Sequence, residues 1–306
     1  MAFLYALPGA VAEGLIWGLM AIGVYISYKI LDIADLTVDG SICTGACVCA
    51  VLLGQGVPVW ICVPAAFLAG ALAGMVTGLL HTALGIPSIL AGILTQLMLY
   101  SVNLLILGGK SLMTVDHRSM TLLVHMSDNP HAILSMGVII AITIVVLWLF
   151  FYTEVGLTLK STGDNPDMSR AQGVDVNFNK VLGLAIANGI VAMAGALLAQ
   201  YKGSANINDG RGAIVIALAA IFIGLSVSMK IKPNFVVSLI GVIGGGIVYY
   251  IVYNFVILLG LKTDYLKMLS AIIVALFLGV PYLKSEYFTK RKAPEAAQQT
   301  GGNADA

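Results

Sequence analysis

Charged residues are scarce in this chain of 306 residues, and long polar stretches are missing. Only 10% of the residues are Asp, Glu, Lys or Arg, whereas 59% are hydrophobic; a soluble domain has roughly 25% charged residues. This composition excludes an ordinary water-soluble globule and leaves no room for a separate catalytic lobe. The 16 Lys and Arg residues nearly balance the 15 Asp and Glu residues, so no basic surface points to nucleic acid as a partner.

Cysteine is also rare, and histidine gathers in one loop. The four cysteines, Cys43, Cys47, Cys49 and Cys62, lie among Ala, Val and Gly, as expected of small apolar side chains packed between helices. No His or carboxylate shares their apolar run, and the three histidines between Gly108 and His131 are irregularly spaced. We therefore expect no metal site in either region.

Apolar sequence is what the chain has in abundance. A bilayer core about 30 Å thick needs about 20 apolar residues per helix, and nine segments approach or exceed that length. They are Ala10–Lys29, Val38–Leu53, Val57–Leu80, Leu84–Leu107, Ala132–Tyr152, Phe178–Tyr201, Ala213–Met229, Pro233–Leu259 and Tyr265–Tyr282. The sequence thus predicts an all-α integral membrane protein with about nine segments in one transmembrane domain, residues 1–285.

The basic residues indicate how the chain is threaded through the membrane. Cytoplasmic loops carry an excess of Lys and Arg. If residues 286–306, a polar tail predicted to be disordered, lie inside, then ten basic residues fall on the cytoplasmic side and six outside. The sequence therefore predicts an outer N-terminus and a cytoplasmic C-terminus. The first residues lack the basic region of a signal peptide, so we expect them to be retained.

The second and the seventh segments are short, and each starts at an Asp-Gly pair. The pairs are Asp39-Gly40 and Asp209-Gly210. Each short segment is preceded by one full segment and followed by two more, and the two run in opposite predicted orientations. This order predicts an inverted repeat with halves at about 10–108 and 178–283, with Ala132–Tyr152 inserted between them. Inverted repeats are typical of transporters whose pathway lies at the repeat interface.

The two aspartates have a structural and a functional interpretation. Asp39 and Asp209 are each expected to cap the N-terminus of their own short helix, where a carboxylate accepts backbone N–H bonds and complements the helix dipole. Direct contact with a transported solute is the alternative.

Glycine recurs at four-residue spacing in the third segment, at Gly70, Gly74 and Gly78. Such a pattern provides a smooth helix face for close approach. The contact lies either within this chain or with a second copy of it.

Ionisable residues are almost missing from the segment interiors, although transporters driven by protons or sodium usually need them there. Those nearest the interiors occupy segment ends: Glu13, Lys29, His81 and Lys267. Thr95, Gln96 and Asn188 are neutral polar residues near mid-segment and are our candidates for lining a pathway; hydrogen bonding between helices is the alternative. Because the segment interiors hold almost no ionisable residues, the energy for uphill transport should come from a partner protein.

The loop at residues 153–177 lies on the predicted cytoplasmic side. Asn165 suits an N-cap, Pro166 the first helical position and Asp167 the positive end of a helix. Gly173 can end that helix. The loop thus predicts a helix of about two turns. Met168, Ala171 and Val174 form a small apolar ridge on one side, offered to a cytoplasmic partner, whereas Asp167 and Arg170 face elsewhere. A surface loop that merely joins two helices is the alternative.

Several of these stretches carry a family resemblance. The Asn165–Gly173 helix, the run Ala185–Tyr201 and the following Gly203–Gly212 turn, together with Leu36–Cys49 and Ile86–Gly92, resemble permease subunits of bacterial ABC importers. The closest group is the branched-chain amino acid and ribose permease superfamily, and within it the branch linked to tryptophan and tyrosine uptake.

The resemblance implies a permease in a bacterial inner membrane whose Asn165–Gly173 helix couples it to an ATPase. Two ATPase subunits, a second permease copy that we expect to be identical, and an extracytoplasmic binding protein contacting the 108–131 loop would complete the complex. ATP and magnesium would be bound by the ATPase, and no cofactor by this chain, which is not expected to be an enzyme.

Two other classes of protein remain to be weighed. A self-sufficient channel or facilitator for a small neutral solute would also suit inverted repeats and neutral polar residues near mid-segment. A membrane-embedded enzyme is disfavoured, because no paired carboxylates and no Ser/His dyad lie at membrane depth.

Overall fold

The computed structural model describes residues 2–115, 122–124, 129–228 and 234–258, and five single positions beyond them, 268, 271, 272, 275 and 279. Six helices in this part are long and apolar enough to cross a membrane, which confirms the all-α polytopic fold. They are α1 (Ala2–Tyr25), continued by the π-helical turn η1 (Ile26–Ile30), α3 (Val59–Thr82), α4 (Ser88–Ile106), α5 (Asn129–Phe151), α8 (Val176–Lys202) and α10 (Phe235–Leu258).

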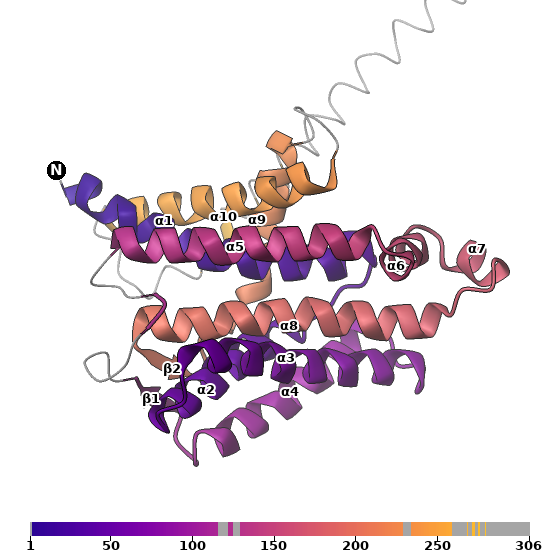
Figure 1. Cartoon of the computed structure of the whole chain (residues 1–306), viewed down its shortest axis with the longest axis horizontal. Coiled ribbons are helices and arrows are strands. Elements are labelled where there is room, and N and C mark those ends of the chain that lie inside the picture. The colour runs from indigo at the N-terminus through magenta and orange to yellow at the C-terminus, as the bar shows by residue number, and fades with distance from the viewer. Residues whose placement is uncertain are drawn as a thin grey trace, which may run out of the picture.

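The remaining elements are short. They are α2 (Val38–Gly54), α6 (Glu154–Asp164), α7 (Pro166–Ala171), α9 (Ala213–Ser228) and the strands β1 (Leu112–Thr114) and β2 (Ser204–Asn206). The two strands pair antiparallel, with Met113 opposite Ala205. Figure 1 shows α6 and α7 at one end of α8 and the strand pair at the other. We call these the α7 end and the strand end of the bundle.

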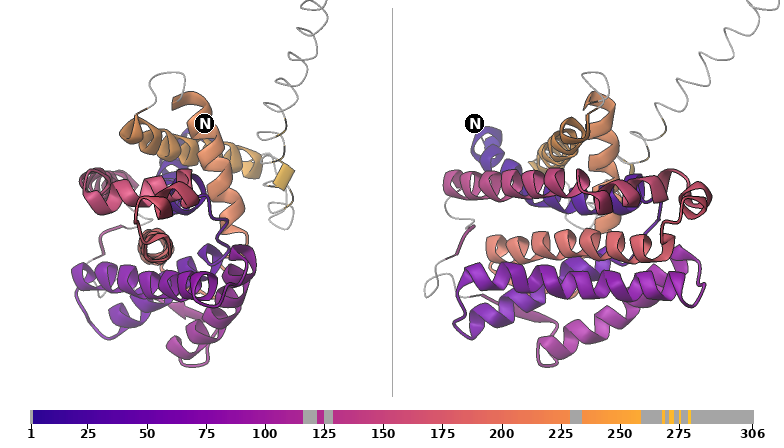
Figure 2. Two further views of the ribbon diagram at one scale, coloured as in Figure 1. Left: turned by 90° about the vertical axis from the view of Figure 1, so that its right-hand side faces the viewer. Right: turned by 45° about the vertical axis from the view of Figure 1, so that its right-hand side comes forward.

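The predicted segments compare closely with the helices. Each of the first eight predicted segments coincides with one helix, although α1 starts at Ala2 rather than at Ala10. The ninth segment, Tyr265–Tyr282, lies mostly outside the described residues, as do the tail, His117 and His125. The seventh segment, α9, is a short helix that is steeply inclined to α8 (Figure 2).

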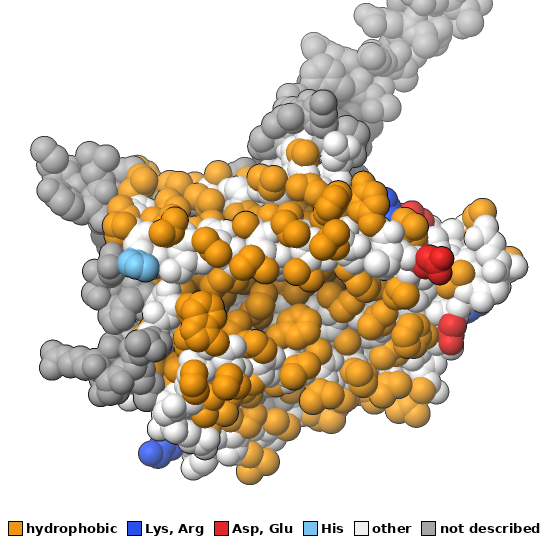
Figure 3. All heavy atoms as spheres, in the orientation of Figure 1, with side chains coloured by type: hydrophobic (Ala, Val, Ile, Leu, Met, Phe, Trp, Pro, Cys, Tyr) orange, Lys and Arg blue, Asp and Glu red, His pale blue; other side chains and the backbone are white. Residues whose placement is uncertain are grey.

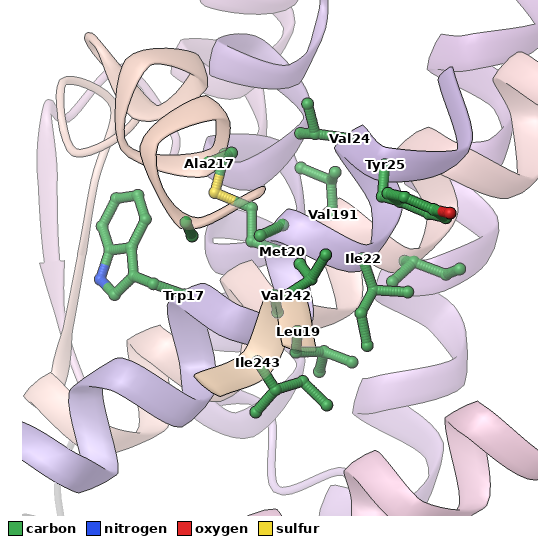
Figure 4. Close-up of a cluster of buried hydrophobic side chains, with 14 of the residues drawn as sticks. Trp17, Leu19, Met20, Ile22, Val24, Tyr25, Val191, Ala217, Val242 and Ile243 are labelled. Atoms are coloured by element: carbon green, nitrogen blue, oxygen red, sulfur yellow. The ribbon is translucent and has the colours of Figure 1, made fainter. Parts of the chain in front are cut away.

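Helix α8 lies at the centre of the bundle. It packs against α1, α2 and α3, and Figure 2 shows it end-on between the other helices. The buried side chains of Leu19, Met20 and Ile22 on α1 pack with residues of α8, α9 and α10 in one apolar core (Figure 4). The central position of α8 explains why its apolar stretch is 78% buried.

Close packing of α3 on α8 depends on glycine. A Cβ atom on Gly74 would meet the backbone of Leu184, and one on Gly78 would meet the Cα of Val181 at 2.7 Å. A Cβ on Gly70 would meet the backbone of Asn188. The repeated glycines therefore serve a contact within this chain, which decides between the two alternatives that the sequence left open.

The outer surface is apolar where a bilayer would contact it. Large exposed hydrophobic side chains cover α4 and α5, among them Leu97, Leu105, Val138, Ile142 and Val146. Figure 3 shows this apolar face, with acidic and basic side chains confined to its ends. Such a face would be costly in water and fits the hydrocarbon core of a membrane.

Substitution of Gly74 tests the α3–α8 contact. We expect Gly74→Ala to lower the free energy of unfolding by about 2 kcal/mol, because the added methyl group forces two backbones apart. Gly137→Ala on α5 is the matched control: its Cβ meets nothing within 4 Å, so we expect a gain of at most about 1 kcal/mol from helix propensity. Thermal unfolding in detergent measures both, and equal stability of the two variants would contradict the close contact.

Candidate functional site

The two short helices, α2 and α9, start next to each other inside the bundle. Gly210, in the turn before α9, packs against the backbone of Asp39, in the first turn of α2, where a Cβ would clash. The Gly210 N–H donates to Cys43 Sγ at 3.1 Å, and the Cys43 thiol donates to the Ile207 carbonyl at 3.3 Å. We call residues 206–212 the central turn.

Asp39 fastens the central turn to α2. Its carboxylate accepts the Gly212 N–H at 2.9 Å through Oδ2 and the Ile214 N–H at 2.9 Å through Oδ1. Unsatisfied N–H groups at a helix start need such an acceptor, and a negative charge there also complements the helix dipole. Asp39 therefore caps α9, the other short helix.

The expected capping arrangement was wrong for both aspartates. Helix α2 starts after Thr37 without a side-chain cap, and Asp39 bonds across to α9 instead of to its own helix. In the described part of the chain, no group hydrogen-bonds or forms an ion pair with the Asp209 carboxylate. Asp39 can reach across because Gly210 has no side chain to hold the two turns apart.

A buried acid, Asp35, was missed by the sequence analysis. It is 3% exposed, and its Oδ2 accepts the Asn188 side-chain N–H at 2.6 Å, near the middle of α8. Its Oδ1 accepts the Thr37 N–H at 2.9 Å, and Ser41 Oγ donates to Asn188 Oδ1 at 2.7 Å. The segment before α2 therefore turns inward and starts that helix in the bundle interior. The Asp-x-Thr spacing before a short segment was the available signal.

The three predicted pathway residues separate in the structure. Asn188 is buried in the Asp35 network, and Thr95 donates to the carbonyl of Ala91 on its own helix. Asn188 follows the alternative interpretation, hydrogen bonding between helices, whereas the Thr95 bond lies within α4. Gln96 instead lines a cavity of about 280 Å³ between α2, α4 and the central turn.

This first cavity, which we call the α4 cavity, has a mixed lining in which polar groups lie beside apolar side chains such as Leu97 and Ile207. Besides Gln96 it is lined by Asp39, Tyr100, Asn103 and Arg211. Asn103 is 1% exposed, and within the described residues its Oδ1 has no hydrogen-bond donor. A buried carbonyl oxygen without a donor is costly, so the cavity suits a ligand or water that donates a hydrogen bond.

A second cavity of about 380 Å³ lies on the other side of the central turn, between α1, α9 and α10. Its lining combines aromatic side chains with charged ones: Trp17, Tyr249, Tyr250, Tyr253, Lys202, Asp209 and Arg211. We call it the aromatic cavity. Arg211 lines both cavities, so the central turn forms the partition between them.

The predicted helix in the 153–177 loop is present as α7. Asn165 Oδ1 accepts the Met168 N–H at 3.0 Å, Pro166 occupies the first turn and Gly173 has φ +84°. Met168 is 59% exposed, and Arg170 lies 3.7 Å from Asp167 at the surface. The sequence did not indicate α6, which precedes α7.

Helix α6 joins α7 rigidly to the bundle. Ser161 Oγ and Ser169 Oγ lie 3.1 Å apart between α6 and α7, and the Asn179 side chain of α8 donates to Thr162 Oγ1 at 3.0 Å. Gly163 lies against the backbone of Ile30 in η1. A displacement of α7 is therefore carried directly to α8 and η1.

No cluster of metal-ligating side chains occurs among the described residues. The four cysteines are free and buried, and Cys43 is engaged by the central turn. Hydrogen-bonding, charged and aromatic side chains line the two cavities.

A helical bundle with an apolar outer face, two short helices that start together in its interior and cavities at that point defines a multi-pass membrane permease. Residues 9–278 match the family described as branched-chain amino acid transport system / permease component. The chain belongs to this family and is a transport permease subunit, which confirms the resemblance inferred from its sequence.

Individual relatives agree with this assignment. A tyrosine transport system permease protein of Clostridioides difficile is 35% identical over 268 residues, 87% of this chain and 88% of the relative. An uncharacterized protein of Rickettsia prowazekii is 31% identical over 90% of this chain and 97% of its own. The autoinducer 2 import system permease protein LsrC of Yersinia pestis is 30% identical over 52% of this chain and 45% of its own. No solved structure matches.

The two aspartates of the short helices should differ in their effect on stability. We expect Asp39→Ala to cost about 2 kcal/mol, because two N–H groups of α9 lose a charged acceptor. Asp209→Ala should change stability by no more than about 0.5 kcal/mol, as for a surface substitution without bonded partners. Thermal unfolding of both variants in detergent provides the comparison. A larger loss of stability for Asp209→Ala than for Asp39→Ala would contradict the assignment of Asp39 as the cap of α9.

Proposed function

We propose that this chain is the permease subunit of an ATP-driven importer and that α7 couples it to a separate ATPase. The observation that carries the proposal is the exposed, well-capped α7 at the α7 end of the bundle, held by α6 against α8 and η1. A coupling element must be exposed to its partner and rigidly joined to the moving helices. Helix α7 meets both requirements.

The contacts suggest a route from α7 to the central turn. Movement of α7 shifts α6 and therefore η1, which Gly163 contacts. The chain from η1 leads directly to Asp35, which is bonded to Asn188 on α8. From there α2 begins, and Asp39 holds the start of α9. A push at the α7 end would therefore alter the partition between the two cavities.

The solute of the proposed importer is a small amino acid-like molecule, for which the central turn and its cavities provide hydrogen-bonding and charged groups. The tyrosine transport system permease protein among the relatives supports an amino acid with an aromatic side chain. In the proposed complex, two copies of this chain and two ATPase subunits receive the solute from an extracytoplasmic binding protein.

The same proposal assigns positions and cofactors. The α7 end faces the cytoplasm of a bacterial cell, and the strand end faces the binding protein outside, in line with the predicted excess of inner Lys and Arg. ATP and magnesium bind to the ATPase subunits, while this chain contributes the pathway and no catalytic group.

Disruption of the α7 surface tests the coupling. The double substitution Met168→Asp with Arg170→Glu removes an exposed apolar contact and reverses a charge, so we expect the permease to lose its ATPase during copurification while thermal unfolding stays unchanged. Leu112→Asp with Lys110→Glu is the matched control, since both residues are exposed at the strand end. This control should retain the ATPase.

Two outcomes would contradict the proposal. If the α7 variant retains its ATPase and its transport, α7 is not the coupling element. If lipid vesicles containing this chain alone accumulate solute against a gradient, the chain has an energy source of its own, and the proposed dependence on an ATPase is wrong.

A further inference from the structure

The aromatic cavity is lined by buried aromatic side chains on one side and by more exposed charged side chains on the other. Trp17 and Tyr250 are each 5% exposed, and their rings stack with centroids 5.8 Å apart. Tyr253 stacks on Tyr249 at 6.3 Å and lies 5.5 Å from Tyr250. The cavity wall formed by α1 and α10 is therefore a continuous aromatic surface.

Charged groups of both signs line the opposite wall. Asp209 and Arg211 lie two residues apart in the central turn, and both line the cavity. They are not paired with each other, because the only ion pair among the described residues joins Arg170 to Asp167. Lys202, at the end of α8, also lines the cavity and is attracted by Glu13, one turn before Trp17 on α1.

Asp209 is half-buried and Arg211 is exposed in the central turn, so a solute in the cavity can reach both charges. The carboxylate of Asp39 caps α9, whereas that of Asp209 accepts no hydrogen bond in the described part of the chain. Capping therefore does not account for Asp209. A carboxylate and a guanidinium beside an aromatic wall are groups that can bind a zwitterion with an aromatic side chain.

We propose that the aromatic cavity is a solute-binding site for an aromatic α-amino acid. Its ring packs against Trp17, Tyr250 and Tyr253, its ammonium group pairs with Asp209, and its carboxylate pairs with Arg211. The volume of about 380 Å³ lies within the range of small-molecule sites. Because Arg211 also lines the α4 cavity, the carboxylate of the solute can stay paired with Arg211 as the solute moves from the aromatic cavity to the α4 cavity.

This site rests on the proposed import function but is tested without the ATPase. The full chain in lipid nanodiscs is titrated with tyrosine under excitation selective for tryptophan. Trp17 is buried in the cavity wall, whereas Trp60 and Trp148 are exposed on the outer surface. We expect a saturable change in tryptophan fluorescence that is lost in Trp17→Phe. Calorimetry measures the affinity of variants that lack Trp17.

Substitutions in the cavity have matched controls. Asp209→Asn and Arg211→Gln should each weaken tyrosine binding about tenfold, the usual effect of losing a charge-assisted hydrogen bond. Asp164→Asn removes an exposed charge at the α7 end and should leave affinity unchanged. Tyr253→Leu should weaken tyrosine binding more than Tyr253→Phe, which keeps the ring.

Ligand analogues separate the alternatives. Leucine lacks the ring, tyramine lacks the carboxylate and 3-(4-hydroxyphenyl)propionate lacks the ammonium group; each should bind about tenfold or more weakly than tyrosine. Leucine binding as tightly as tyrosine would overturn the aromatic class, and tyramine doing so would make the cavity an amine site. Absence of tyrosine binding in a chain whose ATP-driven complex still imports tyrosine would overturn this site and leave the importer proposal intact.

Discussion

The start of a helix inside a membrane bundle is the constraint around which this structure is organised. The first N–H groups of a helix have no partner within it, and the bundle interior offers little water to satisfy them. Helices α2 and α9 both start there. Asp39 supplies a charged acceptor to α9, and Gly210 permits the two turns to approach closely enough for that bond to form. The polar chemistry of the site follows from this requirement.

The central helix and its glycines make such an interior possible. Gly70 and Gly74 bring α3 into backbone contact with α8, and Gly195 brings α8 against the backbone of Ile42 in α2. Side chains of ordinary size would separate these helices and admit lipid or leave voids. The close packing also fixes Asn188 opposite Asp35, so the buried acid keeps two hydrogen-bond donors in a medium where an unpaired carboxylate would be neutralised or expelled.

Local patterns predicted what depends on local physics. Apolar length located eight helices, α1 to α5 and α8 to α10, and the Asn165-Pro166 pair located α7. Spanning length and capping are both properties of a short stretch of chain. The Asp39 bond to α9 joins residues 173 positions apart, and no feature of either stretch specifies its partner. Asp35 was overlooked for the same reason: only the tertiary fold shows that its loop turns inward toward α8. The two cavities likewise arise from helices that are far apart in the sequence: α1, α2, α4, α9 and α10.

The chain thus places its charged groups in two roles that its sequence makes look equivalent. Asp39 and Asp209 each precede a glycine, yet Asp39 accepts backbone N–H groups, whereas Asp209 lines a cavity and has no hydrogen-bonded partner among the described residues. A transporter needs both. In the proposed importer, the Asp39 carboxylate holds the central turn as a partition, and the Asp209 carboxylate beside it is available to a solute. Since both groups belong to one short region, a shift of the turn relative to α2 would change the lining of the two cavities together. On that proposal, a push at α7 would alter solute binding far from the point where it is applied.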